Sequence, residues 1–207
     1  VQKKRSRDPG DSKEMVAARR RFLNAGHYQP IAAAVSRAAL ADLAPGATAS
    51  CLDAGCGEGY YLRQLAAATS DLKTLALLGL DISKWAILSA AKQDQRPNWV
   101  VGSNANLPVL PGTLDRVLCM FGFPVYAEFA RVLKPDGQLL QVDAGPEHLR
   151  ELREIIYPTL KPERTADVQA PEGFTHLSTE PVRYPLNLTG PEQIADLLAM
   201  TPHLYRA

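Results

Sequence analysis

Short apolar runs alternate along the chain with segments whose apolar residues recur every three or four positions. Runs such as 75–81 and 114–121 have the length of strands buried on both faces, and the segments between them have the period of amphipathic helices. This alternation predicts an α/β fold with a mostly parallel sheet and helices on both faces. The predicted helices are 12–23, 30–43, 60–68, 84–92, 126–133, 147–160 and 191–200, and the predicted strands are 49–52, 75–81, 98–102, 114–121 and 138–143.

Turn and cap residues mark several boundaries of these elements. Ser12 and Ser83 stand where helix N-caps are expected, because a serine hydroxyl can accept a hydrogen bond from the first turn of a helix. The Lys-Pro-Asp-Gly turn at 134–137 precedes the fifth strand. The polar stretch 161–173 is predicted to be a surface loop, and 182–188 a strand interrupted by a proline.

The composition fits one globular domain with short extensions. Of the 207 residues, 46% are hydrophobic and 22% charged, which suffices for a core without disulfides. We expect a basic helical segment at 1–46 and the main domain at 47–207, in a fragment that lacks the last strand of its fold. The 3 cysteines show no C-x-x-C spacing, which indicates a reducing compartment and no metal site in this chain. Without an evident signal peptide or membrane span, a cytoplasmic location is expected.

The segment 52–61 carries the most informative motif, Leu-Asp-Ala-Gly-Cys-Gly-Glu-Gly-Tyr-Tyr, between an apolar strand and a helix. A dinucleotide site needs a third glycine beneath the pyrophosphate, but Tyr60 stands in that place. S-adenosylmethionine has no phosphate and needs glycines that admit its methionine and ribose, with an acid for its cationic part. The loop offers these in Asp53, Gly55, Gly57 and Glu58. The alternative is a plain strand-turn-helix with glycines for chain reversal.

Asp81 supports the cofactor interpretation. It ends the second apolar strand, about 25 residues after the loop, roughly the interval of a β-α-β unit. An acid at this point can accept both ribose hydroxyls of a nucleoside cofactor. Alone, an aspartate before a serine is also ordinary helix-start chemistry. Together, the loop and Asp81 predict S-adenosylmethionine as the cofactor.

Basic residues gather at the amino end, although the formal net charge is only +1. Such an arm attracts a phosphate backbone, and a solvated basic helix is the plainer alternative. The candidate RNA-binding residues are Lys3, Lys4, Arg5, Arg7, Arg19 and Arg20.

Segments over nearly the whole chain match one family. The most specific are Arg5-Ser-Arg-Asp-Pro-Gly-Asp11 and Gly26-His-Tyr-Gln-Pro30. On these residues the chain resembles the large-subunit (23S) ribosomal RNA guanine-N1 methyltransferases of the RlmA or RrmA type. The resemblance implies a class I, Rossmann-like domain that transfers a methyl group from S-adenosylmethionine to N1 of a guanine in an RNA hairpin loop. It also implies a homodimer and an amino-terminal zinc ribbon, which this sequence lacks.

The resemblance further assigns residues to the cofactor site. Ser103 or Asn104 stands where many methyltransferases place an acid for the adenine amino group. Tyr28 is alternatively a packing tyrosine, and His148 a surface histidine at a helix start. The positions that match family cofactor contacts are Tyr28, Gly57, Glu58, Asp81 and His148.

The catalytic chemistry leaves alternatives open. Guanine N1 carries a proton that must leave, so a base is expected, and Asp143 and His148 are candidates by position only. Phe121-Gly-Phe-Pro124 replaces the (Asp/Asn)-Pro-Pro-aromatic motif of amine methyltransferases; its phenylalanines either stack on an extruded base or belong to the core. Two other functions compete. One is a small-molecule methyltransferase, and the other is a nicotinamide-dependent oxidoreductase or a non-catalytic nucleotide-binding module. Tyr60 argues against the oxidoreductase.

Overall fold

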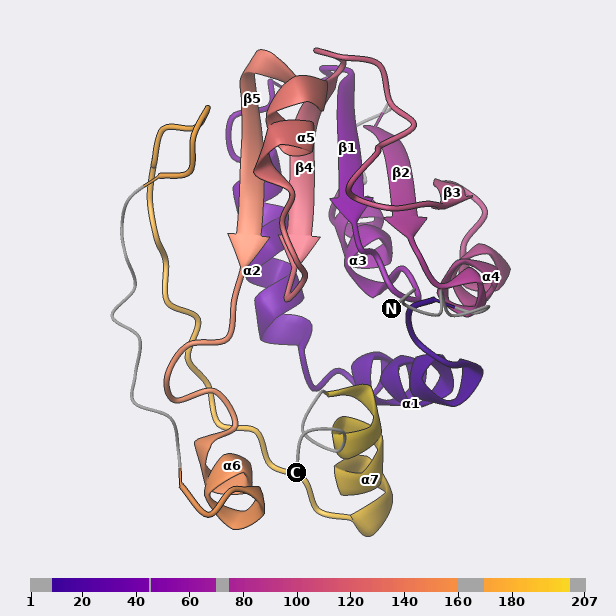
Figure 1. Ribbon diagram of the computed structural model, residues 1–207, viewed down its shortest axis with the longest axis vertical. Helices are drawn as coiled ribbons and strands as arrows, with labels where there is room; N and C mark the ends of the chain where they lie inside the picture. The colour runs from indigo at the N-terminus through magenta and orange to yellow at the C-terminus, as the bar shows by residue number, and fades with distance from the viewer. Residues whose placement is uncertain (1–8, 45, 70–74, 160–169, 202–207) are drawn as a thin grey trace, which may run out of the picture.

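The computed structural model describes residues 9–44, 46–69, 75–159 and 170–201. Its centre is a five-stranded parallel sheet with the order β3-β2-β1-β4-β5 (Figure 1). The strands are β1 (Ala49–Ala54), β2 (Leu75–Asp81), β3 (Asn98–Val101), β4 (Leu114–Met120) and β5 (Leu133–Val142). The helices are α1 (Lys13–Asn24), α2 (Gln29–Leu40), α3 (Tyr60–Ala68), α4 (Lys84–Gln93), α5 (Tyr126–Val132), α6 (Arg150–Ile156) and α7 (Pro191–Met200).

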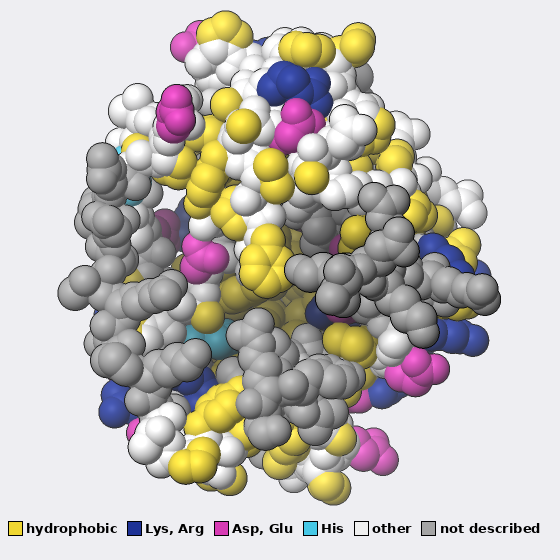
Figure 2. All heavy atoms as spheres, in the orientation of Figure 1, with side chains coloured by type: hydrophobic (Ala, Val, Ile, Leu, Met, Phe, Trp, Pro, Cys, Tyr) yellow, Lys and Arg dark blue, Asp and Glu magenta, His cyan; other side chains and the backbone are white. Residues whose placement is uncertain are grey.

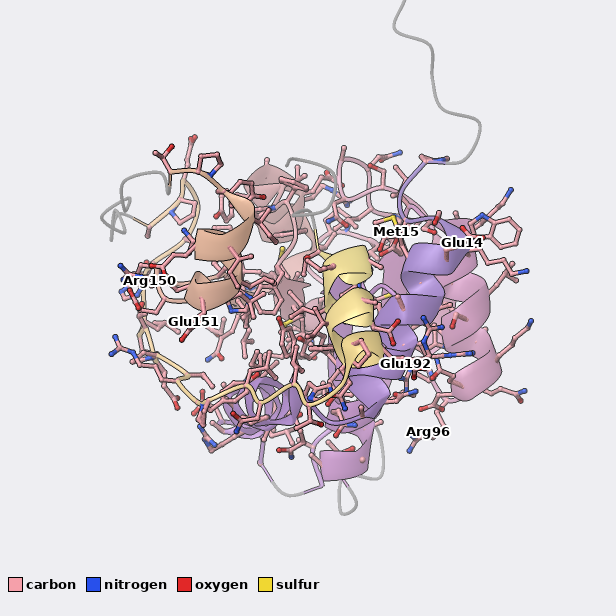
Figure 3. All side chains as sticks on the ribbon, turned by 90° about the horizontal axis from the view of Figure 1, so that it is seen from below. Glu14, Met15, Arg96, Arg150, Glu151 and Glu192 are labelled. Atoms are coloured by element: carbon pink, nitrogen blue, oxygen red, sulfur yellow. The ribbon has the colours of Figure 1, made fainter. Side chains whose placement is uncertain are left out.

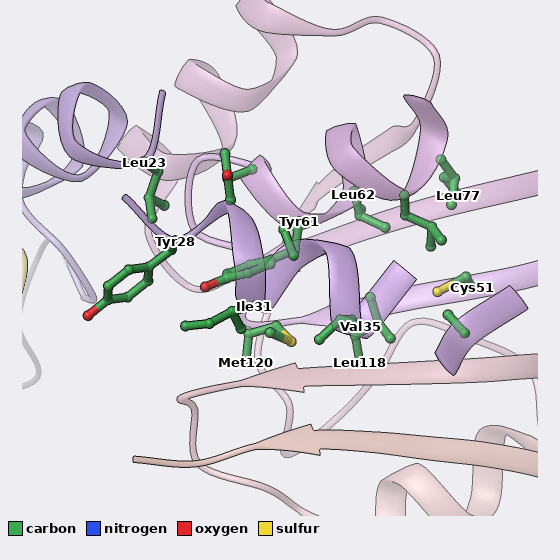
Figure 4. Close-up of a cluster of buried hydrophobic side chains, with 14 of the residues drawn as sticks. Leu23, Tyr28, Ile31, Val35, Cys51, Tyr61, Leu62, Leu77, Leu118 and Met120 are labelled. Atoms are coloured by element: carbon green, nitrogen blue, oxygen red, sulfur yellow. The ribbon is translucent and has the colours of Figure 1, made fainter. Parts of the chain in front are cut away.

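Two hydrophobic clusters, one on each face, fix the helices to the sheet. On one face, side chains of α2 and α3 such as Ile31 and Leu62 pack against Leu118 of β4 (Figure 4). On the other face, Phe129 of α5 packs with Val117 of β4. Each such buried side chain contributes about 1.5–3 kcal/mol relative to exposure. Covered faces explain the continuous apolar runs of the strands, and the predicted α/β fold is confirmed.

The strand order reverses between β1 and β4, because the chain first adds β2 and β3 on one side of β1 and then β4 and β5 on the other. In open α/β sheets, ligands bind beyond the carboxyl ends of the strands at such a reversal. The segments α1, α6 and α7 lie beyond that edge (Figure 1). Seen from below, α1 and α7 lie side by side, with α6 apart from them (Figure 3).

Local sequence signals located most elements accurately. Both predicted caps are confirmed, since the Ser12 hydroxyl accepts from Met15 N and the Ser83 hydroxyl from Ala86 N, each at 3.3 Å. Helices α3 and α7 span the predicted residues. Helix α2 ends at Leu40, earlier than the predicted residue 43.

The region 182–188 corrects one prediction, because it forms no strand within the described part of the chain. Pro185 has no backbone N–H to donate to a sheet. Instead, Tyr184 and Leu186 pack against the cluster that holds α2 and α3. The Tyr184 hydroxyl also donates to the carbonyl of His27, at 3.1 Å.

Two further boundaries differ from the sequence pattern. Strand β5 starts at Leu133 and includes 134–137, which the sequence predicted as a turn before the strand, because Leu133 already pairs with Leu114 ahead of a register shift. Helix α6 covers only Arg150–Ile156 within the predicted 147–160. Of the predicted loop 161–173, residues 161–169 lie outside the described residues, and 170–173 contain no helix or strand.

Candidate cofactor and RNA site

The glycine loop after β1 folds back over the end of β2. Gly55, Gly57 and Gly59 have φ of +90°, +55° and +82°, the left-handed region that glycine adopts without strain. The amides of Gly55 and Cys56 donate to the carbonyl of Leu80, at 2.8 and 2.9 Å. A Cβ on Gly59 would collide with the ring of Trp99, which explains the glycine just before α3. The loop therefore presents bare backbone at the carboxyl edge of the sheet.

Asp53 is a fully buried acid at the end of β1. Its side chain is 0% exposed, and neither carboxylate oxygen has a hydrogen bond among the described residues. Burial, and secondarily the charge of Asp81, raise the pKa of Asp53 to about 8. A buried carboxyl is rarely left unsatisfied, so a cationic or donating ligand group fits this position. The ammonium of S-adenosylmethionine has that chemistry.

Asp81 lies at the end of β2 and faces the glycine loop. Its Oδ2 accepts from the Gly57 amide at 2.9 Å, and its Oδ1 accepts from the Ser83 amide at 2.8 Å. Burial raises the pKa of Asp81, and these two hydrogen bonds oppose the shift. Because a carboxylate has about four lone-pair sites, two backbone bonds leave capacity for two ribose hydroxyls.

The residues after β3 divide their roles. Asn104 faces the glycine loop, with Nδ2 at 3.5 Å from the carbonyl of Ala54 and a buried Oδ1 that lacks a partner among the described residues. The Ser103 hydroxyl instead accepts from Ala105 N at 3.2 Å, inside its own turn. Of the two predicted contacts, Asn104 is therefore the one whose acceptor beside the loop has no hydrogen bond within the described part of the chain.

Three aromatic rings from distant segments meet at the same edge. The ring of Phe121, just after β4, lies 6.0 Å from that of Tyr28 and 5.7 Å from that of His148, centroid to centroid. Tyr28 precedes α2 and is 4% exposed, at the end of the core cluster toward which the strand arrows point (Figure 4). Figure 2 shows a hollow in the middle of this face, lined by hydrophobic side chains and a histidine.

No local pattern in the sequence predicts the backbone conformation of Phe121. This residue has φ of +52°, an unusual conformation for a bulky side chain, and it is 38% exposed. Phe123 is 85% exposed, which excludes the core interpretation for that ring. A Cβ added to Gly122 between them would lie 3.4 Å from Cys119 Sγ, in van der Waals contact.

Glu58 is placed differently from the other loop residues. Its buried carboxylate pairs with Arg63 at 2.9 Å and accepts from Gln93 at 2.5 Å, which ties the loop to α3 and α4. Burial raises the pKa of Glu58, and the charge of Arg63 is the largest opposing effect. The structure therefore brings its carboxylate to Arg63 and Gln93 rather than next to that of Asp81.

The remaining predicted residues are spread around the edge. Asp143 directly follows β5, is exposed, and accepts from Gln141 Nε2 at 2.6 Å. Arg20 is exposed on α1, whereas Arg19 pairs with Asp11 and donates to the carbonyl of Met200 at 3.1 Å. The basic residues predicted from the first segment, Lys3, Lys4, Arg5 and Arg7, lie outside the described residues.

The described residues contain neither a candidate metal cluster nor a helix that could span a membrane. Over the ranges that the structure covers, no group of three or more His, Cys, Asp or Glu side chains could hold a metal ion. Within the same ranges, no helix has the length and apolar character required to traverse a bilayer.

Comparison with known proteins assigns the chain to a family. Residues 51–137 match the model of a methyltransferase domain. YxjB of Bacillus subtilis (strain 168), which is assigned to the 23S rRNA (guanine-N(1)-)-methyltransferases, is 35% identical over 94% of this chain and 70% of its own length. The 23S rRNA (guanine(748)-N(1))-methyltransferase of Streptomyces fradiae is 32% identical over 70% of this chain and 51% of its own length.

Solved structures agree on the fold. An S-adenosyl-L-methionine-dependent methyltransferase structure from Methanococcus maripaludis aligns with a TM-score of 0.53 and 19% identity, over 73% of this chain and 74% of that one. These matches confirm the Rossmann-like methyltransferase fold and do not favour a nicotinamide-dependent enzyme. The chain thus belongs to the 23S ribosomal RNA (guanine-N1)-methyltransferase family.

Proposed function

We propose that this protein transfers a methyl group from S-adenosylmethionine to N1 of a guanine in a hairpin loop of 23S ribosomal RNA. The observation that carries the proposal is the 35% identity to YxjB over 94% of the chain. A glycine loop, an unpartnered buried acid and an acid at the end of β2 supply the chemistry that the methyl donor needs. A small-molecule acceptor is not favoured by the relatives, whose names specify ribosomal RNA.

The cofactor contacts follow from the donor and acceptor groups at the sheet edge. We assign the methionine ammonium to Asp53 and the ribose hydroxyls to Asp81, because a cation offsets a buried carboxylate and hydroxyls can donate to a carboxylate. Gly55 and Gly57 admit the ligand, and Asn104 offers a free oxygen to the adenine amino group. Tyr28 and His148 are proposed to close the site from the side of β4 and β5.

Bound S-adenosylmethionine supplies an electrophilic methyl group on a positively charged sulfur. The protein must then orient guanine N1 and accept its proton, because N1 is a poor nucleophile while protonated. Among the two candidate bases, we favour His148, whose Nε2 lies 3.4 Å from the Tyr28 hydroxyl in the aromatic cluster. Asp143 is exposed and bonded to Gln141, so it remains the alternative base.

RNA is proposed to bind over the aromatic edge and the basic amino-terminal segment. The exposed rings of Phe121 and Phe123 lie just beyond β4, and stacking on a base contributes about 1–3 kcal/mol. Arg20 on α1 and the basic residues from Lys3 to Arg7 are proposed to contact phosphates. Glu58 is proposed to hold the loop in shape through its pairing with Arg63.

Other expectations from the family stay predictions. These are the boundary between a basic segment at 1–46 and the main domain at 47–207, the homodimer, and a zinc ribbon that would precede this segment. The cytoplasmic location is likewise inferred from ribosomal RNA as the substrate.

The proposed function can be tested on RNA from cells and with purified protein. Deleting the full-length gene should remove one N1-methylguanosine from 23S RNA, and mass mapping of the RNA would identify its hairpin. The purified full-length protein should restore that modification in unmodified RNA when S-adenosylmethionine is added. If every N1-methylguanosine of the large subunit survived the deletion, the RNA assignment would be wrong. Binding of NAD without binding of S-adenosylmethionine would refute the methyl donor.

A further inference from the structure

Arg19 lies on the inner face of α1. It stands three positions after Val16 and four before Leu23, both of which are buried, and residues at these spacings share one face of a helix. Its side chain is 24% exposed, whereas the neighbouring Arg20 belongs to the exposed residues. The sequence placed both arginines in one basic arm, but the helix turns them in different directions.

The guanidinium of Arg19 lies against the glycine loop. A Cβ added to Gly57 would stand 3.5 Å from Arg19 Nη1 and 3.6 Å from its Cδ. Two contacts hold the arginine there: an ion pair with Asp11 and a hydrogen bond from Nη2 to the carbonyl of Met200, at 3.1 Å. Because a guanidinium has five N–H donors, these two contacts leave donors for a ligand.

The segment before α1 is itself anchored at the site. The Ser83 hydroxyl donates to the carbonyl of Asp11 at 2.7 Å, and the Ser83 amide donates to Asp81 at 2.8 Å. Gly10 has φ of +82°, and a Cβ there would lie 2.8 Å from Ile82 Cγ2. Asp11 therefore orients Arg19 from a backbone that is packed against the end of β2.

The acids described so far offer no partner to the carboxylate of S-adenosylmethionine. The methionyl end of S-adenosylmethionine carries an ammonium and a carboxylate, and the carboxylate would be repelled by Asp53 and Asp81 unless a cation stands nearby. The charge of Arg19 reaches this region, since it opposes the burial that raises the pKa values of Asp81 and Glu58. Arg63, a second cation beside the loop, pairs with Glu58.

We propose that Arg19 binds the methionyl carboxylate of S-adenosylmethionine and that Asp11 is its positioning residue. The proposal rests on S-adenosylmethionine as the methyl donor and does not depend on the RNA substrate. A planar fork of N–H donors matches a carboxylate, and the small Gly57 leaves space for the ligand beside it.

Equilibrium binding of two ligands tests the role of Arg19. S-adenosylhomocysteine contains the amino acid, whereas 5′-methylthioadenosine keeps the adenosine and the thioether but lacks it. In calorimetric titrations, Arg19→Gln should lower the affinity for S-adenosylhomocysteine about ten- to hundred-fold, which is the effect of losing a charged hydrogen bond. Its affinity for methylthioadenosine should stay within about twofold of the wild type. Arg19→Lys should recover part of the loss, and Asp11→Asn should cause a smaller loss with the same selectivity.

Lys13→Gln, which removes an exposed cation from the same helix, is the matched control and should bind both ligands like the wild type. Intact methylthioadenosine binding also shows that the Arg19→Gln protein is folded. Equal weakening of both ligands, or no weakening of S-adenosylhomocysteine, would overturn the assignment to the carboxylate. If the wild-type protein bound neither ligand, the proposed methyl donor would fail together with the role of Arg19. If Arg19→Gln lost RNA methylation but still bound S-adenosylhomocysteine and methylthioadenosine like the wild type, the carboxylate contact would be wrong and the proposed function would stand.

Discussion

The hydroxyl oxygen of Tyr28 lies 3.4 Å from Nε2 of His148, although 120 positions separate the two residues in the sequence. Tyr28 caps the amino end of α2, and His148 stands between β5 and α6. Their contact closes the carboxyl edge of the sheet on the side away from β3. Phe121 lies against both rings, so the proposed cofactor contacts and a candidate base-stacking ring form one cluster.

Removing the hydroxyl of Tyr28 should separate its catalytic role from its packing role. Tyr28→Phe keeps the buried ring and should change the free energy of unfolding by less than about 1.5 kcal/mol. It should slow methylation, because His148 loses this hydrogen bond to its imidazole. Tyr28→Ala should destabilise the protein by about 3–5 kcal/mol, since a buried aromatic ring is lost. Urea unfolding and single-turnover rates measure the two effects, and equal destabilisation by both variants would contradict this division.

Asp53 should make stability depend on pH between its two pKa values. Its folded-state pKa is about 8, above the ordinary value of 3.8, so the folded protein holds a proton that the unfolded chain releases. The stabilisation from that proton is complete below pH 3.8 and is lost as the pH rises through about 8. The loss should be on the order of a few kcal/mol. Asp53→Asn should flatten this part of the profile in denaturant unfolding from pH 4 to 9.

Binding of S-adenosylmethionine should release the proton of Asp53. The ammonium of S-adenosylmethionine favours the ionised form of Asp53, so binding at pH 7 should release close to one proton. Calorimetry in buffers of different ionisation enthalpy measures this release, and the affinity should rise as the pH approaches about 8. Asp53→Asn serves as the control because it cannot ionise. The same proton release in that variant would assign the proton to another group.

Asp81 should be needed for the ribose and for the loop. Asp81→Ala should weaken the binding of S-adenosylmethionine by at least about 1 kcal/mol, because charge-assisted hydrogen bonds are lost. Asp81→Asn keeps one acceptor for the amide of Gly57 or Ser83, so it should lose less affinity. Asp136→Ala, at an exposed position within β5, is the comparison variant that should bind normally. Unchanged affinity in Asp81→Ala would move the ribose contact elsewhere.

Two glycines with the same backbone conformation distinguish strain from packing. Gly10 and Gly26 have φ of +82° and +84°, but a Cβ on Gly26 meets nothing within 4 Å, whereas one on Gly10 would press on Ile82. Gly26→Ala should cost about 1–2 kcal/mol of stability from backbone strain alone. Gly10→Ala should add a loss of cofactor affinity, because the segment that carries Asp11 must move. Equal affinities in the two variants would show that residues 10 and 11 do not shape the site.

The sequence by itself determined the features that depend only on residues close together in the chain. The glycines of the loop, the caps Ser12 and Ser83, and the acid at the end of β2 follow local rules of backbone geometry and strand length, and the structure shows them where those rules placed them. The alternation of strands and helices likewise fixed a parallel sheet, because its strands must be buried on both faces. These features suffice to indicate the methyl donor.

Only the tertiary structure decided which way the polar and aromatic side chains turn. The Glu58 carboxylate pairs with Arg63 and Gln93 because α3 and α4 bring these side chains to the loop, while its predicted cofactor contact stays a prediction. Arg19 faces the loop and Arg20 faces solvent, since α1 is buried on one side only. Tyr28, Phe121 and His148 meet because parallel strands bring distant segments to one edge. Contacts of this kind depend on packing between elements far apart in the chain, which a local pattern does not encode.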